Sequence, residues 1–389
     1  MKTTRRSAAG ALAATLGSML GLGLMPGTAS TAQSKDLPAE FYPVLSGDGD
    51  LELRLDAIPQ SDDTHGARYD MFLEGEANLG LSFTPEFSLQ SRIKADSVRA
   101  PRPGRDRYIA GTGVFLEQLY ADYQTDNVGA YAGKFGPTFG IAWDRLPDLL
   151  KDGISGDYEL AEMIGFGGTL KFDFGTLGKH EVNAAAFFLD TTLLHRSLFS
   201  TPSAGDDRAE RISHLRRDDG GLANTGKPNN FSATVDGGAF AGLPELFYQI
   251  GYRHLAPGVT ERKSEEGVIG SVGYNFRMAD EVVLTPFVEI AHFWNFNGGN
   301  ADATVVTAAL QANAEPWNIS VAGSWRNIGR DAGTPHTHDY SAGFQVGYSL
   351  GSGFEIGAGY RHERIDGIDA DIVRSYIGYS FEFTKPLGG

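Results

Sequence analysis

Alternation of apolar and polar residues with a period of two is the feature of this chain that most limits its possible folds. Residues 78–95 read NLGLSFTPEFSLQSRIKA, and apolar side chains fall on nearly every second position on both sides of Thr84-Pro85-Glu86. Successive side chains of a β-strand point to opposite faces, so each half predicts a strand with one apolar and one polar face. Because the tripeptide between the halves is a short turn, the stretch is predicted to be a β-hairpin.

The same alternation recurs in about sixteen segments, and the connectors between the segments alternate in length. Segments of this kind include 51–58, 87–96, 164–174, 267–278, 317–327 and 371–383. Connectors of roughly two to six residues alternate with connectors of roughly eight to forty residues, a pattern typical of barrels with short turns on one rim and long loops on the other. The predicted fold class is therefore all-β: a transmembrane antiparallel β-barrel of about 16 strands.

A soluble β-sandwich is the main competing fold, because its strands also alternate. Three observations favour the barrel. The polar positions are polar along whole segments, aromatic residues such as Phe83, Phe87 and Trp317 cluster at segment ends, and the long connectors fall on one side only. In a barrel, lipid would cover the apolar face and a water-filled lumen would meet the polar face.

Composition excludes several other classes of protein. The chain has 389 residues and no cysteine, which excludes thiol catalysis and cysteine-based metal sites. No run of about 20 apolar residues follows the N-terminus, so a helical membrane protein is also excluded. The formal net charge of −16 becomes −19 once the basic residues Lys2, Arg5 and Arg6 of the N-terminus are removed. We expect no binding of nucleic acid by so acidic a chain.

The N-terminus predicts export from the cytoplasm. A basic head is followed by the apolar stretch SAAGALAATLGSMLGLGLM, Pro26 and a run of small residues, which is the pattern of a secretory signal. The chain is accordingly divided into four predicted parts. These are a signal peptide at 1–32, a polar N-terminal lead-in at 33–50, the barrel at 51–383 and a short C-terminal extension at 384–389.

Two stretches carry a family resemblance. In SYIGYSFEF (375–383), Tyr379, Phe381 and Phe383 alternate toward an aromatic end, and TKPLGG follows. AGKFGPTFGIAWDRLPDLLKDGISGDYELAE (132–162) follows the fifth predicted strand. With the strand pattern, these stretches resemble the general bacterial outer-membrane porins, a proteobacterial family of trimeric, sixteen-stranded channels. That family usually ends at the final aromatic residue, where its assembly machinery reads a closing-strand signal, and its loop after strand 5 folds inward and narrows the pore.

The resemblance implies a passive diffusion channel for small hydrophilic solutes and ions in the outer membrane of a Gram-negative bacterium. It further implies a homotrimer, contacts with outer-membrane lipids and lipopolysaccharide, and recognition by the barrel assembly machinery through Tyr379, Phe381 and Phe383. Porins of this kind oppose acids on the inserted loop to basic residues on the wall. The wall residues would be Arg54, Arg92 and Lys94, and the loop residues Asp144, Asp148, Asp152, Asp157 and Glu159. The alternative is that the loop acids are solvated or pair locally with Arg145 and Lys151.

A substrate-specific channel for a sugar, a carboxylate or a similar solute is the alternative function. Acidic and basic side chains mix on the lumen parity, which favours a broad, weakly selective pore. We expect no enzyme, because no serine lies in a recognisable nucleophile context. His336-Thr337-His338-Asp339 is the one histidine pair of interest, but it lacks further ligands, so we expect no metal and no cofactor.

Overall fold

The structure is a computed structural model of the chain. The described residues are 41–63, 68–98, 105–151, 153–200, 216–259, 263–279, 282–329 and 337–388. The predicted signal peptide and Asp152 lie outside them. Within these ranges no helix is long and apolar enough to cross a membrane.

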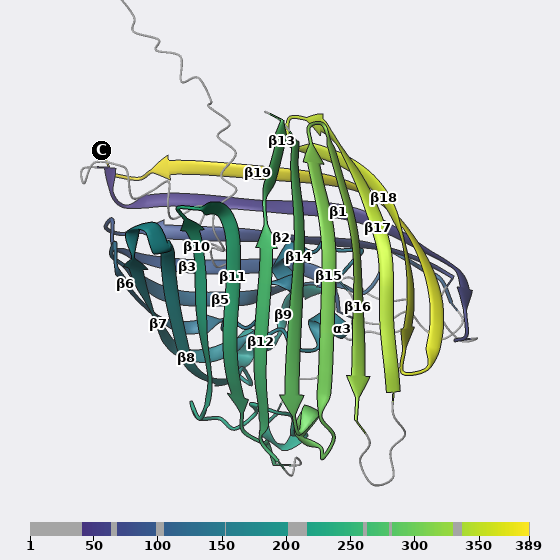
Figure 1. Cartoon of the computed structure of the whole chain (residues 1–389), viewed down its shortest axis with the longest axis horizontal. Coiled ribbons are helices and arrows are strands. Elements are labelled where there is room, and N and C mark those ends of the chain that lie inside the picture. Colours follow the sequence, from purple (N-terminus) through teal and green to yellow (C-terminus); the bar gives the residue numbers. More distant parts are fainter. Residues whose placement is uncertain are drawn as a thin grey trace, which may run out of the picture.

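One continuous β-sheet contains every strand segment of the described residues (Figure 1). The segments are β1 (Val44–Ser61), β2 (Tyr69–Ser82), β3 (Phe87–Ser97), β4 (Arg107–Tyr108), β5 (Thr112–Gln124), β6 (Val128–Phe135), β7 (Met163–Asp173), β8 (Lys179–Leu189), β9 (Ser197–Ser200), β10 (Asn230–Phe240), β11 (Leu243–Leu255), β12 (Glu265–Tyr274), β13 (Phe276–Ala279), β14 (Val282–Trp294), β15 (Ala303–Ala314), β16 (Trp317–Ile328), β17 (Thr337–Gly351), β18 (Phe354–Ile365) and β19 (Ile368–Pro386). Short helical turns are α2 (Ala142–Arg145), α3 (Gly153–Gly156), η2 (Gly175–Leu177), η3 (Leu193–His195), η4 (Arg217–Asp219) and η5 (Phe296–Gly298).

Sixteen of these segments are the strands that form the wall of a closed barrel. Of the remaining three, β13 continues β12 beyond Asn275, β4 pairs with β2, and β9 pairs with β5. Each of these sixteen strands is antiparallel to its two neighbours. Strand β1 pairs with both β2 and β19, which closes the barrel. Closure satisfies the backbone groups of every strand, as a bilayer requires. The predicted fold class, a transmembrane antiparallel β-barrel of 16 strands, is confirmed.

The barrel is longer at both ends than the predicted bounds of 51 and 383. Strand β1 begins at Val44, inside the predicted lead-in, and β19 ends at Pro386, inside the predicted extension. These two ends pair with each other, since Val44 lies opposite Pro386 in the ladder. Pairing at the seam extends both strands, although neither end has the clear alternation that marks the strand centres.

The connectors follow the predicted arrangement, with one exception. The turns after β10, β15 and β17 lie on one rim, and the longer connection after β14 lies on the opposite rim (Figure 1). On that second rim, however, β18 and β19 are joined by Asp366 and Gly367 alone. Both residues have positive φ (53° and 81°), as a two-residue turn of type I′ requires. The alternation predicts the last strand only from residue 371, whereas β19 begins at Ile368, so the connector is shorter than the pattern predicts.

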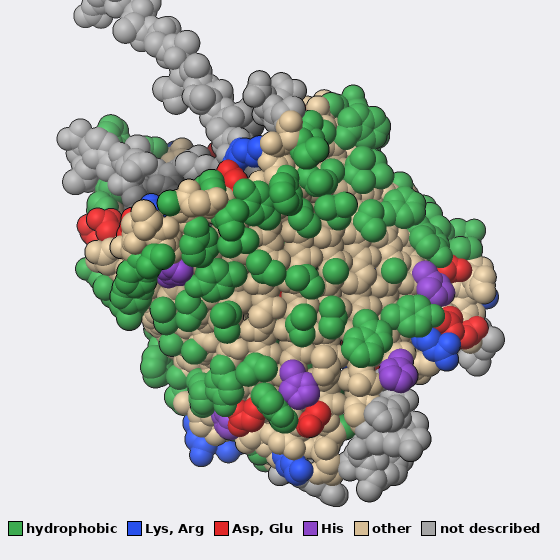
Figure 2. Space-filling view, in the orientation of Figure 1, with side chains coloured by type: hydrophobic (Ala, Val, Ile, Leu, Met, Phe, Trp, Pro, Cys, Tyr) green, Lys and Arg blue, Asp and Glu red, His purple; other side chains and the backbone are tan. Residues whose placement is uncertain are grey.

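The outer surface of the barrel is apolar, with aromatic rings at the strand ends. Apolar side chains spread over the face drawn in Figure 2, and most of its acidic, basic and histidine side chains gather along its edges. Ring pairs mark the short-turn rim: Phe83 with Phe87, Trp317 with Tyr348, and Phe354 with Tyr379, at 5.7, 4.7 and 4.8 Å between centroids. This outer surface suits acyl chains with an aromatic girdle at the interface.

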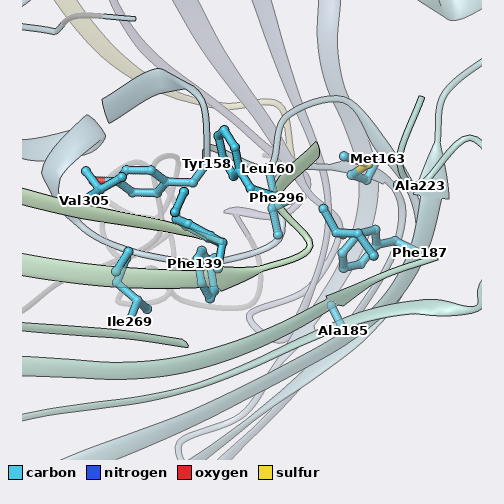
Figure 3. Packing of buried hydrophobic residues seen from close by; sticks show 14 of the residues in the cluster. Phe139, Tyr158, Leu160, Met163, Ala185, Phe187, Ala223, Ile269, Phe296 and Val305 are labelled. Atoms are coloured by element: carbon cyan, nitrogen blue, oxygen red, sulfur yellow. The ribbon is translucent and has the colours of Figure 1, made fainter. Parts of the chain in front are cut away.

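The main hydrophobic core lies inside the barrel rather than between two sheets. Phe139, Tyr158 and Leu160, which belong to the segment between β6 and β7, pack against wall residues such as Ile269 and Phe187 (Figure 3). Fully burying one such side chain stabilises the fold by about 1.5–3 kcal/mol. The segment is therefore held against the inner wall by apolar contacts as well as by the polar contacts described next.

Candidate functional site

The segment 136–162, here called the inner loop, connects β6 to β7 and contacts the wall on several sides. Its hydrogen bonds and ion pairs reach β1, β11, β14, β15, β16, β17 and β18. These strands follow one another around much of the ring. A loop that contacts so many of the barrel strands crosses the interior of the barrel.

Glu289 on β14 is one anchor of the inner loop. Its carboxylate accepts hydrogen bonds from the backbone N–H of Ile141 at 2.6 Å and from the Tyr158 hydroxyl at 2.7 Å. The Ser271 hydroxyl on β12 donates a third bond at 2.7 Å. A negative charge at the start of α2 also meets unsatisfied backbone N–H groups, which favours it electrostatically. One carboxylate thus holds both arms of the inner loop to the wall.

Arg253 on β11 is a second anchor. Its guanidinium donates to the Tyr158 carbonyl at 2.7 Å and to the Glu265 carboxylate at 2.6 Å. It also lies 4.7 Å from the ring centroid of Phe139 and 4.6 Å from that of Phe293. Only 2% of the residue is exposed, so the ion pair and the two rings replace the water that it has lost.

Two side chains of the wall hold the middle of the inner loop, at Leu149 and Lys151. Arg361 on β18 donates to the carbonyls of Leu149 and Lys151 at 2.6 and 2.9 Å. Gln345 on β17 accepts from the backbone N–H of Leu149 at 3.3 Å. Because all of these partners on the loop are backbone groups, the contacts fix the path of the chain rather than a particular side chain.

A buried ionic cluster lies where the inner loop joins β6 and β7. The Lys134 ammonium is 3.0 Å from Glu162 and 2.9 Å from Asp190, and it donates to the Leu194 carbonyl at 3.1 Å. His195 Nδ1 lies 3.1 Å from Glu162. The cluster ties the inner loop to the next long connection. Sequence reasoning missed it because its members come from three segments that are far apart in the chain.

Arg54, the first predicted wall residue, is in direct contact with the inner loop. Its guanidinium donates to Glu52 at 2.8 Å and to both Glu74 and Asp148. Lys151 is 2.8 Å from the other oxygen of Asp148. Although burial opposes ionisation, the charges of Lys151 and Arg54 hold the pKa of Asp148 well below its usual range. Asp148 thus pairs both with Arg54 of the wall and with Lys151 of the inner loop. The local pairing with Lys151, which the sequence leaves open as an alternative, is therefore present.

Asp157 is also paired rather than isolated in the lumen. It accepts from Arg326 on β16, whose guanidinium also bonds Asp339 on β17 at 2.7 Å. His338, the neighbour of Asp339, lies on the other face of β17, where its ring stacks with Trp325 at 6.4 Å. His338 and Asp339 therefore do not share a site, and His336 lies outside the described residues. Within the described ranges no group of three or more His, Asp or Glu side chains could hold a metal ion.

Arg92 and Lys94, the other predicted wall residues, lie side by side on β3. Arg92 donates to Asn78 at 2.8 Å and to Glu117 at 3.4 Å. The Lys94 ammonium is 3.8 Å from Glu117 and 4.0 Å from Asp96. The structure therefore brings these two cations together on the inner wall, with one acid between them.

Asp144 and Glu159 are the two predicted loop acids whose side chains remain exposed without a close ion pair among the described residues. Asp144 interacts electrostatically with Lys151 and Arg92. Loss of bulk water inside the barrel, and then the negative charge of Glu117, raise the pKa of Glu159 to about 7, while Lys94 opposes that rise. Acids of the inner loop and cations of β3 are thus within electrostatic reach of one another.

The residues proposed to carry the assembly signal lie near the end of β19. Tyr379 and Phe383 expose 41% and 38% of their surface, on the outside of the barrel. At the opposite rim, Arg107 bonds Asp70 through two nitrogens at 2.6 and 2.5 Å. Arg107 is therefore held by the wall.

Comparison with known proteins identifies the fold. No protein-family model and no curated protein sequence matches the chain. Among solved structures, the outer membrane channel DcaP of Acinetobacter baumannii is similar with a TM-score of 0.53 and 11% identity, covering 87% of this chain and 98% of that one. A loop deletion mutant of OmpT, an outer membrane protein of Vibrio cholerae, has a TM-score of 0.50 and 11% identity over 87% and 99%. OccAB3 of A. baumannii has a TM-score of 0.50 and 10% identity over 87% and 99%. The chain has the fold of outer-membrane channels.

Proposed function

We propose that this protein is an outer-membrane porin, a passive diffusion channel for small hydrophilic solutes and ions with a charged constriction. The proposal rests on the position of the inner loop and on the charges that it exposes. The loop is anchored inside a closed barrel with an apolar exterior, and it leaves Asp144 and Glu159 exposed within reach of Arg92 and Lys94. A pore filters by the width and charge of its narrowest part, and this arrangement supplies both.

Charges of opposite sign on the inner loop and on β3 produce a field across the lumen. Such a field orients dipolar solutes, whereas an apolar solute must displace the water that the charges hold. Because both signs are present, we infer weak ion selectivity rather than a dedicated anion or cation route. The constriction is formed by the inner loop as a whole, with Asp148 and Asp157 holding it in place and Asp144 and Glu159 facing the passing solute.

The partners follow from the location. The apolar exterior would contact outer-membrane lipids, and the loop rim would contact lipopolysaccharide. We further propose that the protein is a homotrimer, that residues 1–32 direct its export, and that Tyr379, Phe381 and Phe383 are read by the barrel assembly machinery. The similarity to channel folds supports a transport function without catalysis or cofactor.

Reconstitution of the mature protein into planar bilayers tests the proposal. We expect stepwise insertion of open channels with a linear current–voltage relation and a reversal potential close to zero in a salt gradient. Barrels that insert without conducting would overturn the proposal. A chain that stays in solution without detergent would overturn it as well, because the apolar exterior would then have another partner.

A substrate-specific channel is the second candidate, and a cavity lined by Ile141 and Arg145 of the inner loop and by residues of β7, β8, β10 and β11 favours it. Currents that one class of solute blocks at low concentration, in a channel of small conductance, would support that function. A large conductance, of which much remains at saturating concentrations of every solute class, would support the general porin.

A further inference from the structure

A cavity of about 400 Å³ lies between the inner loop and strands β7, β8, β10 and β11. Its volume is within the range of roughly 300–1,000 Å³ that is usual for small-molecule sites. The side chains that matter here are Ile141 and Arg145 of the inner loop, with Lys171, Glu181, Asp236 and Phe247 of the wall. None of the six is among the predicted constriction residues, and the channel function does not by itself require the cavity.

Arg145 is the basic residue that the inner loop contributes to this cavity. Its guanidinium carbon lies 3.9 Å from the ring centroid of Phe247. Across the described part of the chain, the Arg145 side chain makes no hydrogen bond and no ion pair, whereas Arg54, Arg253 and Arg326 make several. Burial lowers the pKa of the Arg145 guanidinium, and the negative charges of Asp144 and Asp236 offset that effect only in part.

The backbone of Arg145 is nevertheless fixed. Its carbonyl accepts from Gln311 on β15, and its N–H donates to the Ile141 carbonyl at 3.1 Å. A planar guanidinium that is held over a ring, with its donors unused, suits a carboxylate that accepts two parallel hydrogen bonds.

Acidic side chains lie on the wall of the same cavity. Asp236 is close enough to interact electrostatically with Arg145, and it accepts from Gln249 at 2.8 Å. Glu181 is 3.8 Å from Lys171. Both carboxylates keep acceptor capacity for an ammonium group. The lining as a whole carries three basic and four acidic side chains, so a ligand of one sign alone would meet like charges.

The apolar part of the lining completes the description. Phe247 is buried in the wall and packs against Ala142 and Leu146, with Ile141 beside them. We propose that this cavity binds small zwitterions that carry an apolar side chain, with the carboxylate on Arg145, the ammonium on Asp236 and Glu181, and the apolar group on Phe247 and Ile141. The inference rests on the proposed channel function, because a solute reaches the cavity through the lumen.

Block of the ion current by L-phenylalanine tests the proposal. We expect a saturable reduction of the potassium current, and little reduction by 3-phenylpropionate, phenethylamine or glycine, each of which lacks one of the three groups. Arg145→Gln should raise the half-saturating concentration about tenfold, because a charge-assisted bidentate contact is lost. Asp236→Asn should weaken block by phenylalanine and should not weaken block by 3-phenylpropionate, because a like charge near that anion is removed.

Arg277→Gln is the matched control, since Arg277 lies on β13 at the short-turn rim and pairs with Glu245 at 2.9 Å. It should leave block unchanged. Equal block by all four solutes, or unchanged block in Arg145→Gln, would overturn the subsite. A steady current without any block would also overturn the subsite and leave the channel function intact. Equilibrium dialysis of labelled phenylalanine against the detergent-solubilised barrel decides binding independently, so an absence of current would count against the channel function alone.

Discussion

Arg54 on β1 donates a hydrogen bond to Asp148, which lies near the middle of the inner loop. The barrel wall and the loop are therefore joined by a direct ion pair at this point, and no water-filled gap separates the two charges. Only 2% of Arg54 is exposed, and its other partners, Glu52 and Glu74, lie on the wall. Asp148 is thus the only partner of Arg54 in the described residues that can hold the loop.

Asp148→Asn should loosen the inner loop without unfolding the barrel. Arg54 keeps two acidic partners, so we expect a loss of about 1–3 kcal/mol in the free energy of unfolding. The release of the loop should appear as larger current fluctuations and a higher mean conductance in planar bilayers. Asp218→Asn, an exchange at an exposed residue of η4, is the matched control. A quiet, wild-type current in Asp148→Asn would show that the other anchors hold the loop unaided.

Glu289→Gln should disturb the inner loop more than Tyr158→Phe does. The carboxylate accepts from Ile141, Tyr158 and Ser271, and a glutamine of the same shape offers one acceptor oxygen and turns an NH₂ group toward a donor. Charge-assisted bonds are roughly twice as strong as neutral ones, so both arms of the loop lose support. Limited proteolysis within 136–162 measures the change. Equal cleavage rates in the two variants would contradict the role of the carboxylate.

The sequence was sufficient to predict the barrel, because apolar and polar residues alternate along the strands and so distinguish the outer face from the inner face. The family resemblance also predicted an inserted loop after the fifth strand and basic wall residues on β3, and their role as a constriction stays a prediction. The sequence did not reveal most of the contacts that anchor the inner loop, since they join residues far apart in the chain, as Ile141 and Glu289 are. Local spacing carries no information on such a pair. The short turn at Asp366-Gly367 was readable from its dipeptide, but the alternation of connector lengths argued for a longer loop there.

Ion selectivity should depend on pH through Glu159. The pKa of this carboxyl is raised to about 7, so the group is mostly neutral at pH 6 and mostly negative at pH 8. A negative charge that appears in the constriction attracts cations, and the reversal potential in a potassium chloride gradient should shift toward cation selectivity as the pH rises. Glu159→Gln should remove most of that shift. An undiminished shift in this variant would assign the titration to another group.

Lys134→Met should be the most destabilising of these exchanges, because it leaves Glu162 and Asp190 without the ammonium that both contact. Only 1% of the Lys134 side chain is exposed, and removing one partner of a buried ion pair typically costs about 3–5 kcal/mol. Urea-induced unfolding from lipid vesicles measures the loss. The double exchange Lys134→Met with Glu162→Gln removes one of the stranded charges and should recover part of the stability. If the double variant is no more stable than Lys134→Met alone, the cost arises from lost packing of the lysine stem rather than from the unpaired carboxylates.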